Sequence, residues 1–157
     1  MNAPDLIRRF ELKPHPEGGW YREIHRSALR VETGRGARAA LTTIYYLLER
    51  QQVSRWHTVA ADEVWHFYAG APLELFAYEP GARRLTGHTL GPPDGGGVPV
   101  AVIPAGHWQA ARSLGEYTLA GCSVGPGFEF ADFRFVSTLP EHTAHFAAPL
   151  AHLRGLL

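Results

Sequence analysis

An imidazole and a carboxylate, His57 and Glu63, are the two side chains of this sequence best suited to chemistry. Both can bind a divalent metal ion, and both can transfer protons near neutral pH. Two other positions decide between metal binding and proton transfer. Val59 lies two residues after His57, on the same face of a strand, and Gln109 follows the turn Pro104-Ala105-Gly106. Valine cannot ligate a metal, and an amide oxygen is a weaker ligand than imidazole. The sequence therefore predicts no tightly bound metal and no other cofactor; the ligands of any bound metal would be His57, Glu63 and Gln109.

Strand periodicity predicts which polar side chains share one pocket, because residues two apart in a strand point to the same face. The predicted members are Arg55, His57, Glu63, Trp65 and Gln109. A small barrel has little reason to bury four polar side chains unless each finds a partner or a ligand. The pocket therefore indicates a binding site for a small polar molecule. The alternative is that His57 and Glu63 form a satisfied pair inside the core.

Many short strands separated by Gly/Pro turns must position these side chains. We predict strands at 20–26, 40–48, 55–58, 63–68, 73–78, 85–90, 98–103, 108–112, 117–124 and 130–136. A helix is predicted over 5–11, and one or two short helices follow Pro140. This pattern predicts a sandwich or barrel, with one domain over 1–157 and a barrel core over about 20–137. We expect the core to consist mainly of Ile44, Leu47, Leu75, Val102 and Leu119.

Composition and charge exclude several classes of partner. Formal net charge is zero and the basic residues are scattered, which argues against a nucleic-acid partner or an anionic membrane surface. No apolar run reaches the roughly 20 residues that a membrane-spanning helix needs. The single cysteine, Cys122, excludes an internal disulfide and favours a reducing, cytoplasmic location. Its apolar neighbours predict a buried structural thiol.

Segments spread over nearly the whole chain resemble one branch of the cupin superfamily, the predicted sugar epimerases that were formerly a family of unknown function. They are 12–23, 43–48, 62–75, 104–110 and 124–133. His57, Glu63, Gly70 and the Pro-x-Gly turn match the standard cupin pattern, whereas Val59 and Gln109 replace two of its histidines. The resemblance implies an all-β cupin double-stranded β-helix, a jelly-roll barrel with short N- and C-terminal helices.

The resemblance also implies a sugar-related activity, by analogy with keto-sugar epimerases. Such a reaction removes a proton next to a carbonyl and returns it to the opposite face, so it needs a base, a donor for the enolate oxygen and an acid. His57 is the predicted base, with Glu63 or Asp132 fixing its tautomer. Arg55 or Gln109 would donate to the enolate.

The opposing acid has two candidates, Tyr68 and Tyr21. Tyr68 has the wrong strand parity for the pocket unless a β-bulge intervenes. Glu17 and Tyr21 flank the glycine pair Gly18-Gly19, which permits a tight turn that covers the pocket or completes a neighbouring subunit's sheet. Glu17, Tyr21 and Phe130 are therefore predicted to contact the ligand.

Two other functions stay open at the level of sequence. One is a metal-dependent cupin oxygenase or decarboxylase, and the other is a non-catalytic binding module that uses the same pocket. A homodimer is predicted, because outward aromatic residues such as Trp56 and Tyr68 exceed what one short chain can cover. The partners predicted for the chain are thus a small-molecule ligand and a second copy of itself.

Overall fold

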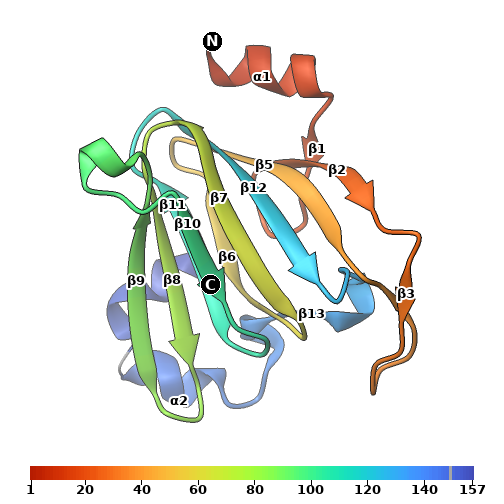
Figure 1. Ribbon diagram of the computed structural model, residues 1–157. Helices are drawn as coiled ribbons and strands as arrows, with labels where there is room; N and C mark the ends of the chain where they lie inside the picture. Colours follow the sequence, from red (N-terminus) through yellow and green to blue (C-terminus); the bar gives the residue numbers. More distant parts are fainter. Residues whose placement is uncertain (149) are drawn as a thin grey trace.

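Two antiparallel sheets face one another in the computed structural model, which describes residues 1–148 and 150–157 (Figure 1). The larger sheet contains, in spatial order, β1 (Lys13–Pro14), β2 (Trp20–Arg26), β5 (Thr42–Glu49), β12 (Tyr117–Gly125), β7 (Asp62–Gly70) and β10 (Val100–Ile103). The second contains β13 (Phe133–Phe135), β6 (Val53–Val59), β11 (Trp108–Ser113), β8 (Leu73–Glu79) and β9 (Arg84–Leu90). A separate two-stranded ribbon pairs β3 (Arg30–Val31) with β4 (Arg38–Ala39). This arrangement is the predicted all-β jelly roll.

The space between the sheets is filled at one end and open at the other. Apolar side chains that alternate along the strands fill the closed end, since successive residues of a strand face opposite sides. They include Tyr46, Leu48, Trp65, Leu75 and Ile103. The open end is surrounded by β2, β6, β7 and the segment that precedes β13, and it contains the candidate site.

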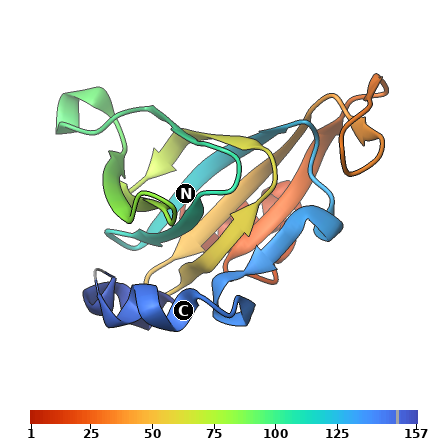
Figure 2. The same ribbon diagram turned by 90° about the horizontal axis from the view of Figure 1, so that it is seen from below.

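Helices cover the outer faces (Figures 1 and 2). Helix α1 (Ala3–Phe10) is capped by the Asn2 side chain, which accepts a hydrogen bond from the Asp5 amide, and it packs on the larger sheet. The C-terminal α2 (His142–Ala147) and the 3₁₀ helix η4 (Ala151–Leu156) pack on the second sheet, over Trp56 and its neighbours. Trp56, expected to be uncovered, is therefore buried by the chain's own C-terminus. The homodimer stays a prediction.

Most predicted strands are confirmed, and the errors lie at the irregular parts. Residues 130–136 form the 3₁₀ turns η2 (Phe130–Asp132) and η3 (Val136–Thr138) around the short β13, not one strand. The short strands β1, β3 and β4 and the 3₁₀ turn η1 (Pro93–Gly95) were not predicted. Of the predicted core, Leu47 and Leu119 lie on the outer face under α1, and Val102 is 51% exposed. Within the described residues, no helix is both long enough and apolar enough to cross a membrane.

Three β-bulges change the direction of side chains in β2, β6 and β7. In β2 the extra residue is Ile24, because Glu23 pairs with Ile44 while His25 pairs with Thr43. In β6 an extra residue lies opposite Ala110, because Gln109 pairs with His57 while Ala111 pairs with Ser54. In β7 the extra residue is Tyr68, since the partners Leu119 and Ala120 pair with Ala69 and Phe67. Each bulge reverses the inside–outside alternation at its position.

Candidate acid–base site

A cavity of about 140 Å³ opens at this end of the sandwich. Four ionisable side chains line it at depth, and aromatic rings and a charged cluster line the approach. The deep residues are His15, Glu17, His57 and Glu63; the rings are Tyr21, Phe128, Phe130 and Phe133; the charged residues are Glu23, Arg26 and Glu129. Phe130 is 54% exposed, so it lies at the mouth.

Glu17 reaches the cavity from the turn that joins β1 to β2. The turn is closed by hydrogen bonds from the His15 amide to the Gly19 carbonyl (2.9 Å) and from the Gly18 amide to the His15 carbonyl (3.0 Å). It packs on β6, where the Arg55 amide donates to the Glu17 carbonyl. Gly18 has φ +116°, and a Cβ atom there would lie 2.0 Å from the Val53 carbonyl oxygen. Only glycine permits this approach, which places Glu17 beside β6.

Glu17 and His57 face one another at the cavity. His57 Nδ1 lies 2.7 Å from the Arg55 carbonyl oxygen, which can only accept, so Nδ1 carries a hydrogen. Nε2 lies 3.2 Å from Glu17 Oε2. Burial raises the pKa of Glu17 and lowers the pKa of His57, so it favours the neutral form of both groups. The Ser54 hydroxyl donates to the other Glu17 oxygen at 2.9 Å.

His15 presents a hydrogen-bond donor to the cavity. Its Nδ1 accepts from the Glu17 amide at 3.2 Å, so Nε2 carries the hydrogen of the neutral ring. Within the described chain, no protein atom accepts from Nε2 at hydrogen-bond distance. Burial lowers the pKa of His15, which keeps the ring neutral at pH 7, and Tyr21 packs edge-on against it with ring centres 4.5 Å apart. The Nε2–H group is available to a ligand.

Glu63 is the second buried carboxyl group of the cavity. It projects from β7 and accepts a hydrogen bond from Gln109 Nε2 at 2.5 Å. Trp65 Nε1 donates to Gln109 Oε1 at 3.0 Å, which fixes the orientation of the amide. Burial raises the pKa of Glu63 to about 6, against the opposing effect of His57. Gln109 and Trp65, predicted to contact the ligand, lie behind Glu63 and hold it.

Two candidate site residues, Arg55 and Tyr68, lie outside the cavity. Arg55 was expected to share the face of His57, but the extra residue in β6 turns it outward, so its expected direction was wrong. Its guanidinium lies 4.3 Å from the centre of the Phe135 ring and donates to the Pro16 carbonyl. Tyr68 faces outward, as its strand parity indicates, and the bulge of β7 does not turn it inward: it is 49% exposed and lies beside Tyr45. Tyr68 therefore does not supply the opposing acid.

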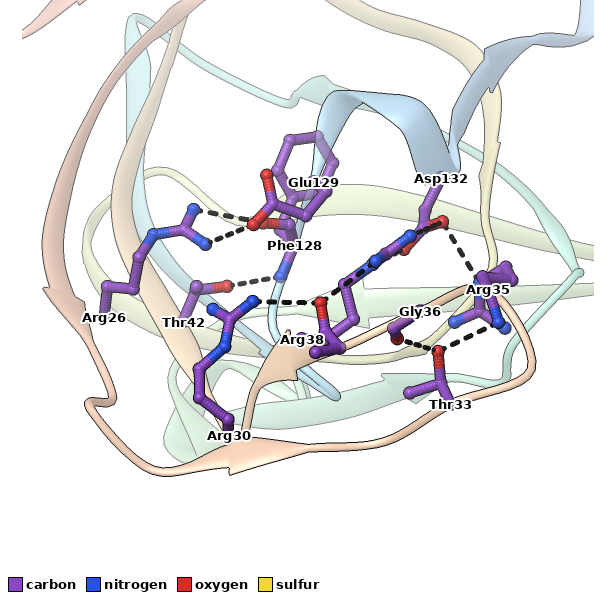
Figure 3. A network of polar contacts seen from close by, with 11 residues as sticks. Arg26, Arg30, Thr33, Arg35, Gly36, Arg38, Thr42, Phe128, Glu129 and Asp132 are labelled. Carbon is purple, nitrogen blue, oxygen red and sulfur yellow. Dashed lines mark hydrogen bonds and ion pairs between the residues drawn. The ribbon is translucent and has the colours of Figure 1, made fainter.

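Asp132 is buried but belongs to a different cluster (Figure 3). Arg38 donates to both of its oxygens, at 2.8 and 3.0 Å, and Arg35 donates at 3.1 Å. Hydrogen bonds from Arg38 lower the pKa of Asp132 below its usual value. The expectation that Asp132 orients His57 was wrong, because the Arg55 carbonyl does so. Asp132 instead ties the β3–β4 ribbon to η2.

The sequence profile of the Cupin superfamily (DUF985) matches residues 4–136. The chain belongs to the cupin superfamily. A hypothetical protein from Leishmania major is 32% identical, with a TM-score of 0.82 over 94% of this cupin and 96% of that chain. A protein from Shewanella oneidensis is 34% identical, with a TM-score of 0.79 over the same shares. No curated protein matches this cupin in sequence.

A single-residue variant of oxalate decarboxylase from Bacillus subtilis is a more distant structural neighbour. It is 13% identical, with a TM-score of 0.59 over 92% of this cupin and 37% of that chain. This likeness shows the fold alone.

A cupin metal site needs three imidazoles and a carboxylate, and this donor set does not fit. At two of the positions stand Val59, which has no donor atom, and Gln109, whose amide is already engaged by Trp65 and Glu63. His57 Nε2 faces Glu17. The described residues contain no group of three or more His, Cys, Asp or Glu side chains arranged to hold a metal ion.

Sequence reasoning missed several members of the site. The aromatic residues Phe128 and Phe133 and the charged residue Arg26 line the cavity of this cupin without having been singled out. Cys122, predicted to be buried and structural, is buried and also lines the cavity, and burial raises its pKa well above the usual value. The one available signal was the His-Pro-Glu-Gly-Gly turn of residues 15–19, in which a glycine pair follows ionisable side chains.

Proposed function

We propose that this cupin is a metal-independent isomerase that moves a proton on the carbon next to a carbonyl group of a small, sugar-like substrate. The observation that carries the proposal is the approach of Glu17 Oε2 to His57 Nε2, 3.2 Å apart at an open cavity that Glu63 also lines. The resemblance to predicted sugar epimerases supports a sugar-like substrate. The aromatic rings at the approach suit the apolar face of a sugar ring.

The two carboxyl groups of the site suit opposite roles. Glu63, with a pKa of about 6, is mostly ionised at pH 7 and can accept a proton from carbon. Burial raises the pKa of Glu17 and so favours its protonated form, and in this role Glu17 beside His57 would return a proton.

The proton steps balance without an oxidant. Glu63 removes the proton, the C–H electron pair forms the enolate, and the carbonyl oxygen gains negative charge. The His15 Nε2–H group would donate to this oxygen, as a neutral imidazole can. The Glu17–His57 pair would then protonate the carbon from the other side, and protons exchanged with water would reset both groups.

Deuterium exchange tests the proposal. Free aldoses and ketoses and keto-sugar nucleotides are incubated with the protein in deuterated water, and incorporation of deuterium next to the carbonyl is followed by NMR. We expect Glu17→Gln to lower the exchange rate about a hundredfold or more, since it removes the transferable proton. Glu116→Gln is the control, because this side chain is 77% exposed. Lack of exchange in every sugar tested would refute the proposal.

A non-catalytic binding module is the second candidate. One observation favours it: in the described part of the chain, every buried side-chain nitrogen and oxygen already has a hydrogen-bond partner. Because its buried polar atoms are already paired, such a site can be stable without being catalytic. Sugar binding without deuterium exchange would support this candidate.

A further inference from the structure

The approach to the cavity contains one arginine, and its charge is already neutralised. Arg26 Nε and Nη2 donate to the two Glu23 oxygens at 3.0 and 2.9 Å, and Nη1 donates to Glu129 at 2.9 Å. Nη2 also donates to the Phe128 carbonyl at 3.0 Å. Figure 3 shows this guanidinium directed at the Phe128–Glu129 segment. One cation with two carboxylates leaves the approach with a net negative charge, so Arg26 anchors this segment and does not recruit anions.

The deep part of the cavity carries negative charge and no cation. His15 and His57 are neutral at pH 7 because burial lowers both pKa values. Burial raises the pKa of Glu17 and favours its neutral form, whereas Glu63 is mostly ionised above pH 6. Among the described residues that line the cavity, Arg26 is the one Lys or Arg side chain. A phosphate or carboxylate here would meet Glu63 without a counter-charge, in a site where water screens poorly.

The volume of the cavity bears on the size of the ligand as well. An engineered protein cavity of about 150 Å³ accepts a benzene molecule, so a cavity of about 140 Å³ can hold one six-membered ring, whose substituents extend toward the open mouth. A nucleoside diphosphate would have to remain outside, against the carboxylates Glu23 and Glu129. The polar groups at depth suit uncharged partners: the His15 Nε2–H group can meet a carbonyl oxygen, and the Glu63 carboxylate can accept from a hydroxyl group.

We infer that the substrate is an uncharged monosaccharide or a hydroxy-carbonyl compound of similar size, and not a sugar phosphate, a sugar acid or a nucleotide sugar. This inference rests on the proposed function, whose site it uses. It deepens that function by naming the charge and size of the substrate.

Matched sugars test the charge preference. D-Fructose, D-fructose 6-phosphate, D-glucose, D-glucuronate and D-glucosamine are titrated into the protein above pH 7, and binding is followed through the protein's NMR signals. Deuterium exchange is measured on the same samples. We expect the neutral sugars to bind at least about tenfold more tightly than the matched anions, because a like charge near Glu63 is unfavourable in a poorly screened site. Glu63→Gln should narrow this ratio at least about threefold, whereas the exposed Glu116→Gln should leave it unchanged.

The outcomes separate this inference from the proposed function. Exchange in fructose 6-phosphate or glucuronate that equals or exceeds exchange in the neutral sugars would overturn the inference and leave the isomerase standing. Tighter binding of glucosamine would overturn it too, because the site would then select a cation. Neutral sugars that bind selectively but never exchange would support the inference and refute the isomerase. Absence of binding for all five sugars at millimolar concentration would overturn both.

Discussion

Two buried carboxyl sites in this molecule are stabilised in opposite ways. Asp132 and Glu63 each expose 8% of their surface, yet the pKa of Asp132 is lowered while that of Glu63 is raised to about 6. Depth and partners both differ: Glu63 lies deep, where burial raises its pKa, and meets an amide, whereas Asp132 lies nearer the surface and meets the guanidinium groups of Arg35 and Arg38. An arginine partner fixes a charge and serves structure, while an amide partner leaves the proton free to move. The carboxyl group to examine for chemistry is therefore the one that lacks an arginine.

The largest stability effect should follow from Asp132→Asn. This change removes the acceptors of two arginines that hold the β3–β4 ribbon, and we expect a loss of about 2–3 kcal/mol in the free energy of unfolding. Urea unfolding at pH 7 measures it, with the exposed Asp94→Asn as control. A loss below about 1 kcal/mol would show that the Asp132 carboxylate does not have the structural role that distinguishes it from Glu63.

The pH dependence of stability should have opposite signs at the two sites. Glu63 binds its proton more tightly in the folded state, so stability falls as the pH rises from about 4.5 to about 6, by roughly 2 kcal/mol. Asp132 has a lowered pKa, so its contribution is present at neutral pH and is lost as the pH falls below about 4. Unfolding of the wild type and of Glu63→Gln is compared from pH 4 to pH 7. A stability difference between them that stays constant with pH would contradict the raised pKa.

A smaller effect is expected from His57→Ala. The cavity can admit water in place of the ring, and Glu17 keeps the Ser54 hydrogen bond, so we expect a loss of about 1 kcal/mol. Sugar binding and exchange should disappear in the same variant. Thermal melts of His57→Ala and of the double variant with Glu17→Gln provide the measurement. A loss above about 3 kcal/mol that Glu17→Gln rescues would make this pair structural, as Asp132 is.

The smallest effect should come from removing metals. Because the donor set at Val59 and Gln109 does not fit the cupin metal site, treatment with a chelator should leave the melting temperature and the exchange rate unchanged. Elemental analysis of the untagged protein gives an independent check. Near one iron, manganese or zinc ion per chain would contradict this prediction and favour a metal-dependent cupin.

Strand patterning predicted the fold and part of the site. Alternation along β7 places Glu63 and Trp65 inside, as predicted, because their segment precedes the bulge at Tyr68. A bulge adds one residue without changing composition, so a pattern of period two cannot show where the alternation reverses. Arg55 was misplaced for this reason.

Strand periodicity could not predict the contacts between distant parts of the chain. Glu17 and His57 are brought together by the packing of Gly18 against Val53, which no local periodicity encodes. Asp132 likewise meets Arg35 and Arg38 from far along the chain. In both cases the polar partner determines the role of the carboxyl group, and tertiary contacts determine which residue is that partner.

The β1–β2 turn also bears on how this fold could change its chemistry over time. Glu17 comes from a short edge segment, while His57 and Glu63 lie on strands within the sheets. A change confined to this turn would therefore alter the polar partner of His57 and leave the strands that carry His57 and Glu63 in place.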